Sequence, residues 1–214
     1  MSSEITICNL ALSHIRGGSI NALTEASIQA QQCKLLYPIL RDSVLENAPW
    51  QFATRIVSLA ELTDVEVFNF AYAYQYPSDC LKIKRLILNW ETVNRTDSQF
   101  YGNNLPIINT QAPVPYQVFN DDGNRVIGAN YAELRAEYTV QVTDTNLFST
   151  QFILALSHLL AAELAIPIVG VNEGRKLKSD SMQQYNAHIR AACAAMMNEQ
   201  FTPMPDSEFI TVRN

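Results

Sequence analysis

Apolar residues recur every three or four positions near the start of the chain, which is the spacing that puts side chains on one face of a helix. The positions that predict a first helix over residues 3–16 are Ile5, Cys8, Leu12 and Ile15. Gly17 and Gly18 follow directly. Glycine commonly ends a helix because it adopts positive φ without strain, so we expect the first helix to stop there.

A second helix is predicted to begin near residues 24–27 and to end before Pro49, because apolar residues again follow in steps of three and four. Pro38 lies inside this segment. Proline has no amide hydrogen, so the carbonyl of Lys34 loses its helical partner. We therefore expect a kink at Pro38 or a break of the helix into two pieces.

The middle of the chain, residues 51–144, is rich in β-branched and aromatic residues and predicts strands. Two short runs flank the turn sequence of residues 120–124, in which Gly123 supplies positive φ, so they predict a hairpin. A third strand is expected over residues 132–142, and the three strands should form an antiparallel meander with one buried face. Several prolines and asparagines in residues 89–115 predict a long irregular connection.

Helical spacing returns after the strands, with an apolar helix over residues 147–166 and an amphipathic helix over residues 172–200. Two prolines prevent the last segment from continuing that helix. The order of elements predicts an α+β fold in which the terminal helices form a bundle and the strands form a central antiparallel lobe. The predicted parts are an α-helical bundle (residues 1–50 and 145–201), a β-rich lobe (51–144) and an extended C-terminal tail (202–214).

Composition and charge narrow the classes of protein that fit this pattern. The chain has 214 residues, of which 48% are hydrophobic and 17% are charged, so it can bury a core and is not intrinsically disordered. Its formal net charge is −6. Tight binding to nucleic acid depends on clustered Lys and Arg that displace counterions, so an acidic chain is a poor candidate for that function.

No membrane partner and no disulfide framework are expected. Residues 152–169 are apolar enough to suggest a membrane span, but Ser157, His158 and Glu163 interrupt them and favour a buried helix. The first residues lack the pattern of a secretory signal, which indicates synthesis in the cytoplasm. The cysteines have no paired spacing and are predicted to be reduced and packed in the core. These cysteines are Cys8, Cys33, Cys80 and Cys193.

The sequence offers little sign of catalysis. The common nucleophile, phosphate-binding and zinc-protease motifs are absent, so neither a cofactor nor a metal is expected. His14, His158 and His188 are isolated on predicted helices and are interpreted as structural. Glu133 and Glu137 share one face of the third predicted strand and are candidates for a glycosidase carboxylate pair.

Two segments are candidates for an interface. The densest basic run lies at the start of the last predicted helix, where cations oppose the helix dipole, so we expect a carboxylate or phosphate partner there. The tail carries apolar residues after its two prolines, and no other large apolar stripe is visible in the sequence. The candidate portal or subunit interface residues are Arg175, Lys176, Lys178, Phe209, Ile210, Val212 and Arg213.

Three strings of the sequence together resemble one family. The first is residues 9–15, Asn-Leu-Ala-Leu-Ser-His-Ile, followed by a glycine turn. The second is residues 48–53, Ala-Pro-Trp-Gln-Phe-Ala, and the third is residues 72–82, which contain Tyr-Gln-Tyr-Pro-Ser-Asp-Cys. The chain resembles the tail tubular protein A type of head-to-tail adaptor from short-tailed bacteriophages. The three strings lie in the first two fifths of the chain. The rest of the chain agrees with this family mainly in the order of its helices and strands.

The resemblance implies a non-enzymatic structural protein of the virion. Such an adaptor forms a dodecameric ring under the portal protein, and a tail nozzle similar to tail tubular protein B docks on its other side. The bundle and the C-terminal tail then face the portal, the β-rich lobe faces the tail, and genomic DNA passes through the lumen without sequence-specific binding. An acidic chain suits such a conduit, because it does not hold phosphates tightly.

Two other functions stay open at this point. A tail-associated cell-wall (peptidoglycan) hydrolase would use acidic side chains such as Glu133 and Glu137. A small cytoplasmic helical binding module would have no role in a virion and would bind no portal ring. Since the sequence shows no large apolar stripe outside its tail, we expect the ring to form only on the portal.

Overall fold

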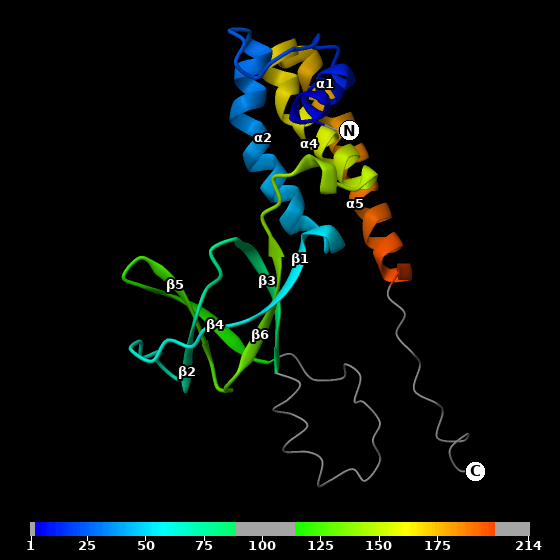
Figure 1. Cartoon of the computed structure of the whole chain (residues 1–214). Helices are drawn as coiled ribbons and strands as arrows, with labels where there is room; N and C mark the ends of the chain where they lie inside the picture. The colour runs from blue at the N-terminus through cyan, green and yellow to red at the C-terminus, as the bar shows by residue number, and fades with distance from the viewer. Residues whose placement is uncertain (1–2, 89–113, 200–214) are drawn as a thin grey trace, which may run out of the picture.

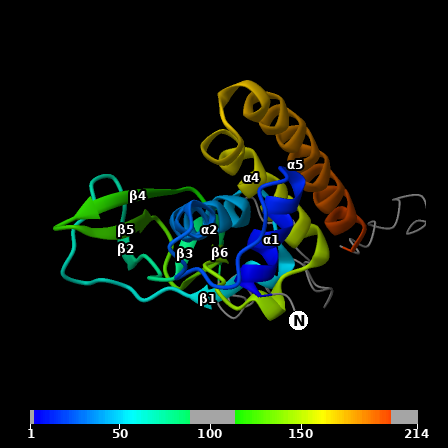
Figure 2. The same cartoon turned by 90° about the horizontal axis from the view of Figure 1, so that it is seen from above.

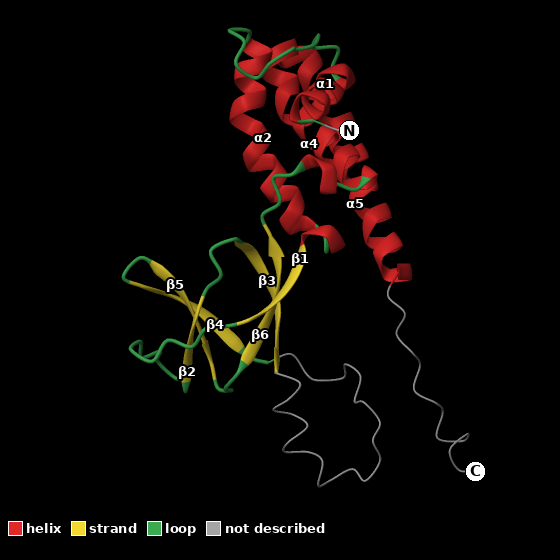
Figure 3. Ribbon diagram, in the orientation of Figure 1, coloured by secondary structure: helices red, strands yellow, loops and turns green. Residues whose placement is uncertain are grey.

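The computed structural model describes residues 3–88 and 114–199, which form a mixed α and β structure (Figure 1). Four α-helices and two three-stranded antiparallel sheets make up this described part. The helices are α1 (Glu4–His14), α2 (Ile28–Asn47), α4 (Thr150–Val169) and α5 (Val171–Glu199). The strands are β1 (Thr54–Ser58), β2 (Tyr72–Gln75), β3 (Cys80–Leu88), β4 (Tyr116–Asp121), β5 (Asn124–Ala129) and β6 (Leu134–Val140). Figure 3 shows the helices, here called the helical part, at one end and the strands, here called the β part, at the other.

Helix α1 begins where the sequence predicts, but a different residue ends it. The Ser3 side chain accepts a hydrogen bond from the Thr6 amide at 3.1 Å and caps the first turn. At the other end Arg16 adopts the left-handed conformation with φ of 56°. The Gly17 amide then donates to the Leu12 carbonyl at 2.8 Å, which completes a Schellman motif. The prediction that a glycine supplies the left-handed residue is therefore wrong by one position.

Helix α2 is one continuous helix with Pro38 inside it, so the predicted break into two pieces is wrong. Pro38 and Lys34 both lie on the exposed side of the helix. Water can hydrogen-bond the Lys34 carbonyl there, so the missing amide leaves no buried polar group unsatisfied. Tyr37 and Val44 are buried on the opposite side, and their packing keeps the helix intact.

Helix α4 is the central element of the helical part. It contacts α1, α2 and α5, and it lies between α2 and α5 when the molecule is seen from above (Figure 2). Of the described helices it alone is long and apolar enough to cross a membrane by length and composition, and 56% of its most apolar window is buried inside the protein. The predicted burial of this segment is confirmed.

The strands form two sheets, so the prediction of a single meander is wrong. One sheet has the order β1-β6-β3 and the other has the order β2-β5-β4. The predicted hairpin is confirmed as β4–β5, and its turn has positive φ at Asp122 (45°) and Gly123 (83°), as a type I′ turn requires. The third predicted strand, β6, pairs instead with β1 and β3. Glu133, at φ of 55°, redirects the chain between the two sheets.

Strand β6 has the buried face that its alternating sequence predicts. Leu134, Ala136, Tyr138 and Val140 are all buried. The adjoining turn is also as expected, because the Cys80 amide donates to the Pro77 carbonyl at 3.1 Å as the chain enters β3. Of the four cysteines, Cys8, Cys33 and Cys80 are buried and Cys193 is half-buried, and all four are free thiols.

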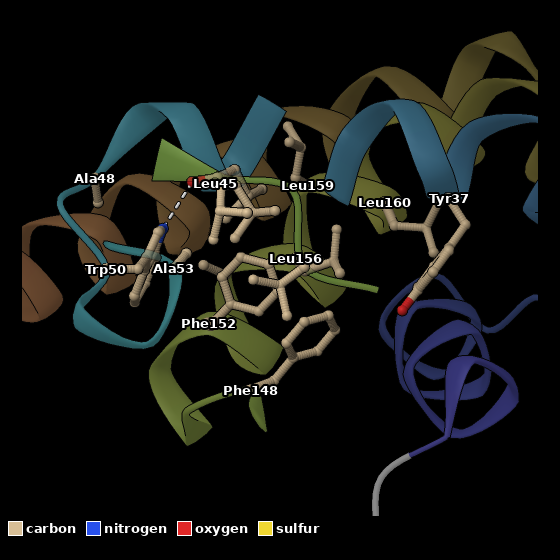
Figure 4. Packing of buried hydrophobic residues seen from close by; sticks show 14 of the residues in the cluster. Tyr37, Leu45, Ala48, Trp50, Ala53, Phe148, Phe152, Leu156, Leu159 and Leu160 are labelled. Atoms are coloured by element: carbon tan, nitrogen blue, oxygen red, sulfur yellow. Dashed lines mark hydrogen bonds between the residues drawn. The ribbon is translucent and has the colours of Figure 1, made fainter. Parts of the chain in front are cut away.

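An aromatic cluster joins the helical part to the β part (Figure 4). The Phe152 ring of α4 meets Trp50 edge-on at 5.2 Å, Phe52 edge-on at 5.3 Å and Phe148 at 4.5 Å between ring centroids. The Trp50 indole Nε1 donates to the Val44 carbonyl at 2.8 Å. That carbonyl lies in the last turn of α2, so the indole of Trp50 also caps the end of the helix.

Candidate interaction surfaces

The structure covers only part of the predicted interface. Phe209, Ile210, Val212 and Arg213 lie outside the described residues, as does nearly all of the connection predicted over residues 89–115. The basic residues at the start of α5 are described. The candidate surfaces therefore come from the helical part and from the strand face that carries the acidic residues.

The predicted basic run divides into one paired and two exposed cations. The Lys178 ammonium donates to both carboxylate oxygens of Glu163 on α4, each at 3.0 Å. Arg175 and Lys176 are exposed. The expectation of a carboxylate partner is thus met for Lys178 inside the same chain, and it leaves two cations on the surface of the first turns of α5.

A close approach between α5 and α4 orients these cations. A Cβ atom at Gly174 would lie 2.8 Å from the carbonyl oxygen of Ala165, so only glycine permits the observed spacing. Gly170, with φ of 98°, joins the two helices. Because Gly174 faces α4, its neighbours Arg175 and Lys176 point away from the helical part.

The three histidines, which the sequence left isolated, form a stack across three helices. The rings of His14 on α1 and His158 on α4 lie 4.1 Å apart at an interplanar angle of 13°. The rings of His158 and His188 on α5 lie 5.3 Å apart at 15°. His14 Nε2 is 3.4 Å from Ser157 Oγ, and His188 Nδ1 is 3.1 Å from Gln151 Oε1. No spacing along the chain indicates this arrangement, since each ring comes from a different helix.

Two members of the histidine stack (His14, His158 and His188) have a lowered pKa, namely His14 and His158. Burial lowers the pKa of His158 to about 4, and repulsion from His14 and His188 adds to the effect. Burial, then repulsion from His188, also lowers the pKa of His14. Nδ1 of His158 is buried and has no hydrogen-bond partner within the described part of the chain. His14 and His158 are therefore neutral at pH 7 and contribute through packing.

A shallow hollow of about 400 Å³ adjoins the stack and is lined by His14, His158 and Asp180 among others. The ring nitrogens do not converge in it, because stacked rings present their faces to one another. Within residues 3–88 and 114–199, no group of three or more His, Cys, Asp or Glu side chains is arranged to hold a metal ion. The stack is therefore not a metal site of the kind that convergent imidazoles form.

The two glutamates considered for hydrolysis do not share a strand. Glu137 lies on β6, where its carboxylate accepts a hydrogen bond from Arg85 Nε on β3 at 2.6 Å. Glu133 precedes β6 and has left-handed backbone. The expectation that both lie on one face of the same strand is wrong, because the chain turns at Glu133 before the strand begins.

An exposed apolar row on α2 is a surface that the sequence analysis missed. Ile28, Leu35 and Ile39 are 63%, 61% and 62% exposed. Their separations of seven and four positions put them on the same side of the helix. The helical spacing was visible in the sequence, but the pattern of α2 was interpreted as one buried face. The expectation that the tail holds the only large apolar stripe is therefore wrong.

Comparison of the chain with protein-family models finds no match, and comparison with curated proteins finds none either.

Proposed function

We propose that this chain is a structural head-to-tail adaptor of a short-tailed bacteriophage, similar to tail tubular protein A. In this proposal it forms a dodecameric ring under the portal protein, completes the head, docks the tail nozzle and lets DNA pass. It acts by assembly and has no catalytic role. The protein is then a component of the virion, at the junction of head and tail.

The observation that carries the proposal is the position of the residues on which the resemblance rests. Trp50 lies in the aromatic cluster between the helical part and the β part (Figure 4). The Phe52 ring belongs to the same cluster, 6.0 Å from Trp50 between ring centroids. Tyr74 and Cys80, from the third string, are buried in the β part. These residues therefore hold the framework of the two parts, which is what a shared architecture requires and what a catalytic motif does not.

The division into two parts supports an adaptor with two different binding faces. In the proposal the helices of residues 1–50 and 145–201 form a bundle that faces the portal, and the β lobe of residues 51–144 faces the tail. Arg175 and Lys176 contact the portal or a neighbouring subunit. The C-terminal extension, residues 202–214, binds in the same region through Phe209, Ile210, Val212 and Arg213.

Light scattering of the purified protein, alone and mixed with the portal ring of the same phage, tests the proposal. The expected result is a portal-bound ring of this chain. Deletion of residues 203–214 should abolish attachment, and the double reversal Arg175→Glu with Lys176→Glu should weaken it more strongly at low salt than at high salt. A protein that ignores the portal under all of these conditions would refute the adaptor function.

The alternative, a tail-associated peptidoglycan hydrolase, receives less support from the geometry. Glu137 is paired with Arg85, and Glu133 does not lie on the same strand. Zymography of the wild type and of Glu137→Gln distinguishes the two functions. Lysis by the wild type that is lost in the variant would favour the hydrolase.

A further inference from the structure

Two cysteine side chains from different helices meet in the core of the helical part. Cys8 lies on α1 and Cys33 lies on α2, and both are fully buried. The thiol of Cys8 donates a hydrogen bond to the sulfur of Cys33. The two sulfur atoms are therefore direct neighbours, although the residues lie about 25 positions apart in the sequence.

The connector between the two helices helps to keep the thiols together. The side chain of Asn9 donates to the Ile20 carbonyl at 2.9 Å and accepts from the Ile20 amide at 2.8 Å. Nε2 of Gln29 on α2 donates to the Gly17 carbonyl at 3.3 Å. These hydrogen bonds attach the connector to both helices, so they hold α1 beside the first turns of α2, where Cys33 lies.

The hydrogen bond makes the two thiols chemically different. It raises the pKa of Cys8, because ionisation would break the bond, and burial raises it further. The same bond stabilises the thiolate of Cys33 and lowers the pKa of that residue, against the opposing effect of burial. Cys33 is therefore the thiol of this pair that ionises first and the stronger candidate for a nucleophile.

The other two cysteines have different surroundings. Cys80 lies in the β part, where its thiol donates to the Tyr76 hydroxyl at 3.3 Å. Cys193 lies on α5 and is half-buried. Both are internal references for the reactivity of the thiols in the same chain.

We infer that Cys8 and Cys33 are a redox-active pair, which an oxidant of the low-molecular-weight disulfide class converts into a disulfide bond between α1 and α2. A reducing cytoplasm keeps both residues as thiols, and an oxidising medium closes the bond. The inference does not depend on the proposed adaptor function.

The reaction balances in two exchange steps. The thiolate of Cys33 attacks one sulfur of the oxidant, which forms a mixed disulfide and releases the first half of the oxidant as a thiol. The sulfur of Cys8 loses its proton to water and attacks the sulfur of Cys33, and the second half of the oxidant leaves as a thiol. The chain gives up two hydrogen atoms, and the oxidant takes them up as it is reduced to two thiols. Because both cysteines are fully buried, the first step requires a local opening of α1.

Treatment of the folded protein with dithiodipyridine, followed by peptide mapping in a mass spectrometer, tests the inference. In the wild type the peptides of Cys8 and Cys33 should be found joined, with a mass about 2 Da below their sum. Cys193→Ala is the matched control and should form the same bond. Cys33→Ala should leave Cys8 either free or with one pyridinethiol attached.

The stability of the oxidised protein tests the fit of the bond to the fold. The bond closes a loop of about 25 residues, so we expect a rise in Tm of about 5 °C or more, and a dithiol reductant should reverse it. A lower Tm in the oxidised protein would overturn the fit.

Three results of the mapping would overturn the pair itself, and all come from the wild type, so they do not depend on the folding of a variant. The first is pyridinethiol attached to Cys8 or Cys33 without a bond between them. The second is equal linkage of either residue to Cys80 or Cys193, because pairing would then follow unfolding and not native contact. The third is two unmodified thiols at Cys8 and Cys33 after Cys193 has reacted completely.

Discussion

Mild acid is expected to destabilise this protein through the histidine stack. The imidazole of His158 lies between the rings of His14 and His188, and burial lowers its pKa from 6.5 to about 4. As the pH falls below 6.5, the unfolded chain binds a proton before the folded chain does. The folded state therefore loses stability between about pH 6.5 and pH 4. Asp180 lines the same hollow.

The size of the loss follows from the two pKa values of His158. For a group that titrates at 6.5 when unfolded and at about 4 when folded, linkage gives a loss of about 2 kcal/mol in the free energy of unfolding at pH 5. His158 is only half-buried, so solvent screens part of this effect. We expect a loss of about 1 kcal/mol from this histidine.

Urea unfolding at about pH 7.5 and about pH 5 measures the effect. The variant His158→Phe keeps a flat ring in the stack but cannot bind a proton, so its unfolding free energy should fall by about 1 kcal/mol less than that of the wild type between the two pH values. Met182→Leu, a half-buried non-titrating change on α5, is the control and should keep the wild-type pH dependence. Equal pH dependence in the wild type and in His158→Phe would refute the reasoning.

Three further predictions concern stability. Trp50→Ala removes a buried indole and its hydrogen bond to the Val44 carbonyl, so the free energy of unfolding in urea should fall by about 3–5 kcal/mol. A loss below about 1 kcal/mol would contradict the capping role of Trp50. Gly174→Ala would put a Cβ atom 2.8 Å from the Ala165 carbonyl oxygen, so Tm should fall despite the higher helix propensity of alanine. A higher Tm would show that α4 and α5 separate easily. Arg16→Gly removes the strain of a left-handed residue with φ of 56°, so the free energy of unfolding should rise by about 0.5–1 kcal/mol and Tm should rise with it. No gain would mean that contacts of the arginine side chain offset the strain.

The helices were predictable from the sequence because their cores follow a local period. The apolar spacing places α1, α2, α4 and α5 within a few residues of their observed ends. The break that Pro38 could have caused was not excluded by the sequence, because the effect of this proline depends on which side of α2 faces water, and that is decided by packing on α4. The pairing of strands was not predictable for a similar reason, since β6 follows the β4–β5 hairpin along the chain but pairs with β1 and β3 from distant segments.

The candidate surfaces were less predictable, because each depends on contacts between distant segments. The basic run at Arg175 was visible in the sequence, but the pairing of Lys178 with Glu163 depends on how α5 folds back on α4. The histidine stack depends on three helices at once. The apolar row of α2 was visible in the sequence. Ile28, Leu35 and Ile39 lie outside the buried face of the helix and repeat at helical spacing on another side of it.

The aromatic cluster has a mechanical consequence for the whole molecule. The chain passes between the helices and the sheets twice, near Trp50 and again near Phe148. The side chains of both residues pack on the ring of Phe152. A hinge requires a crossing that can rotate without breaking packed contacts. A tilt of the sheets would disturb the edge-on and tilted contacts of these aromatic rings and the hydrogen bond from Trp50 to the end of α2. We therefore expect force applied to the sheets to be passed to α2 and α4 through these contacts and not to be absorbed by a hinge.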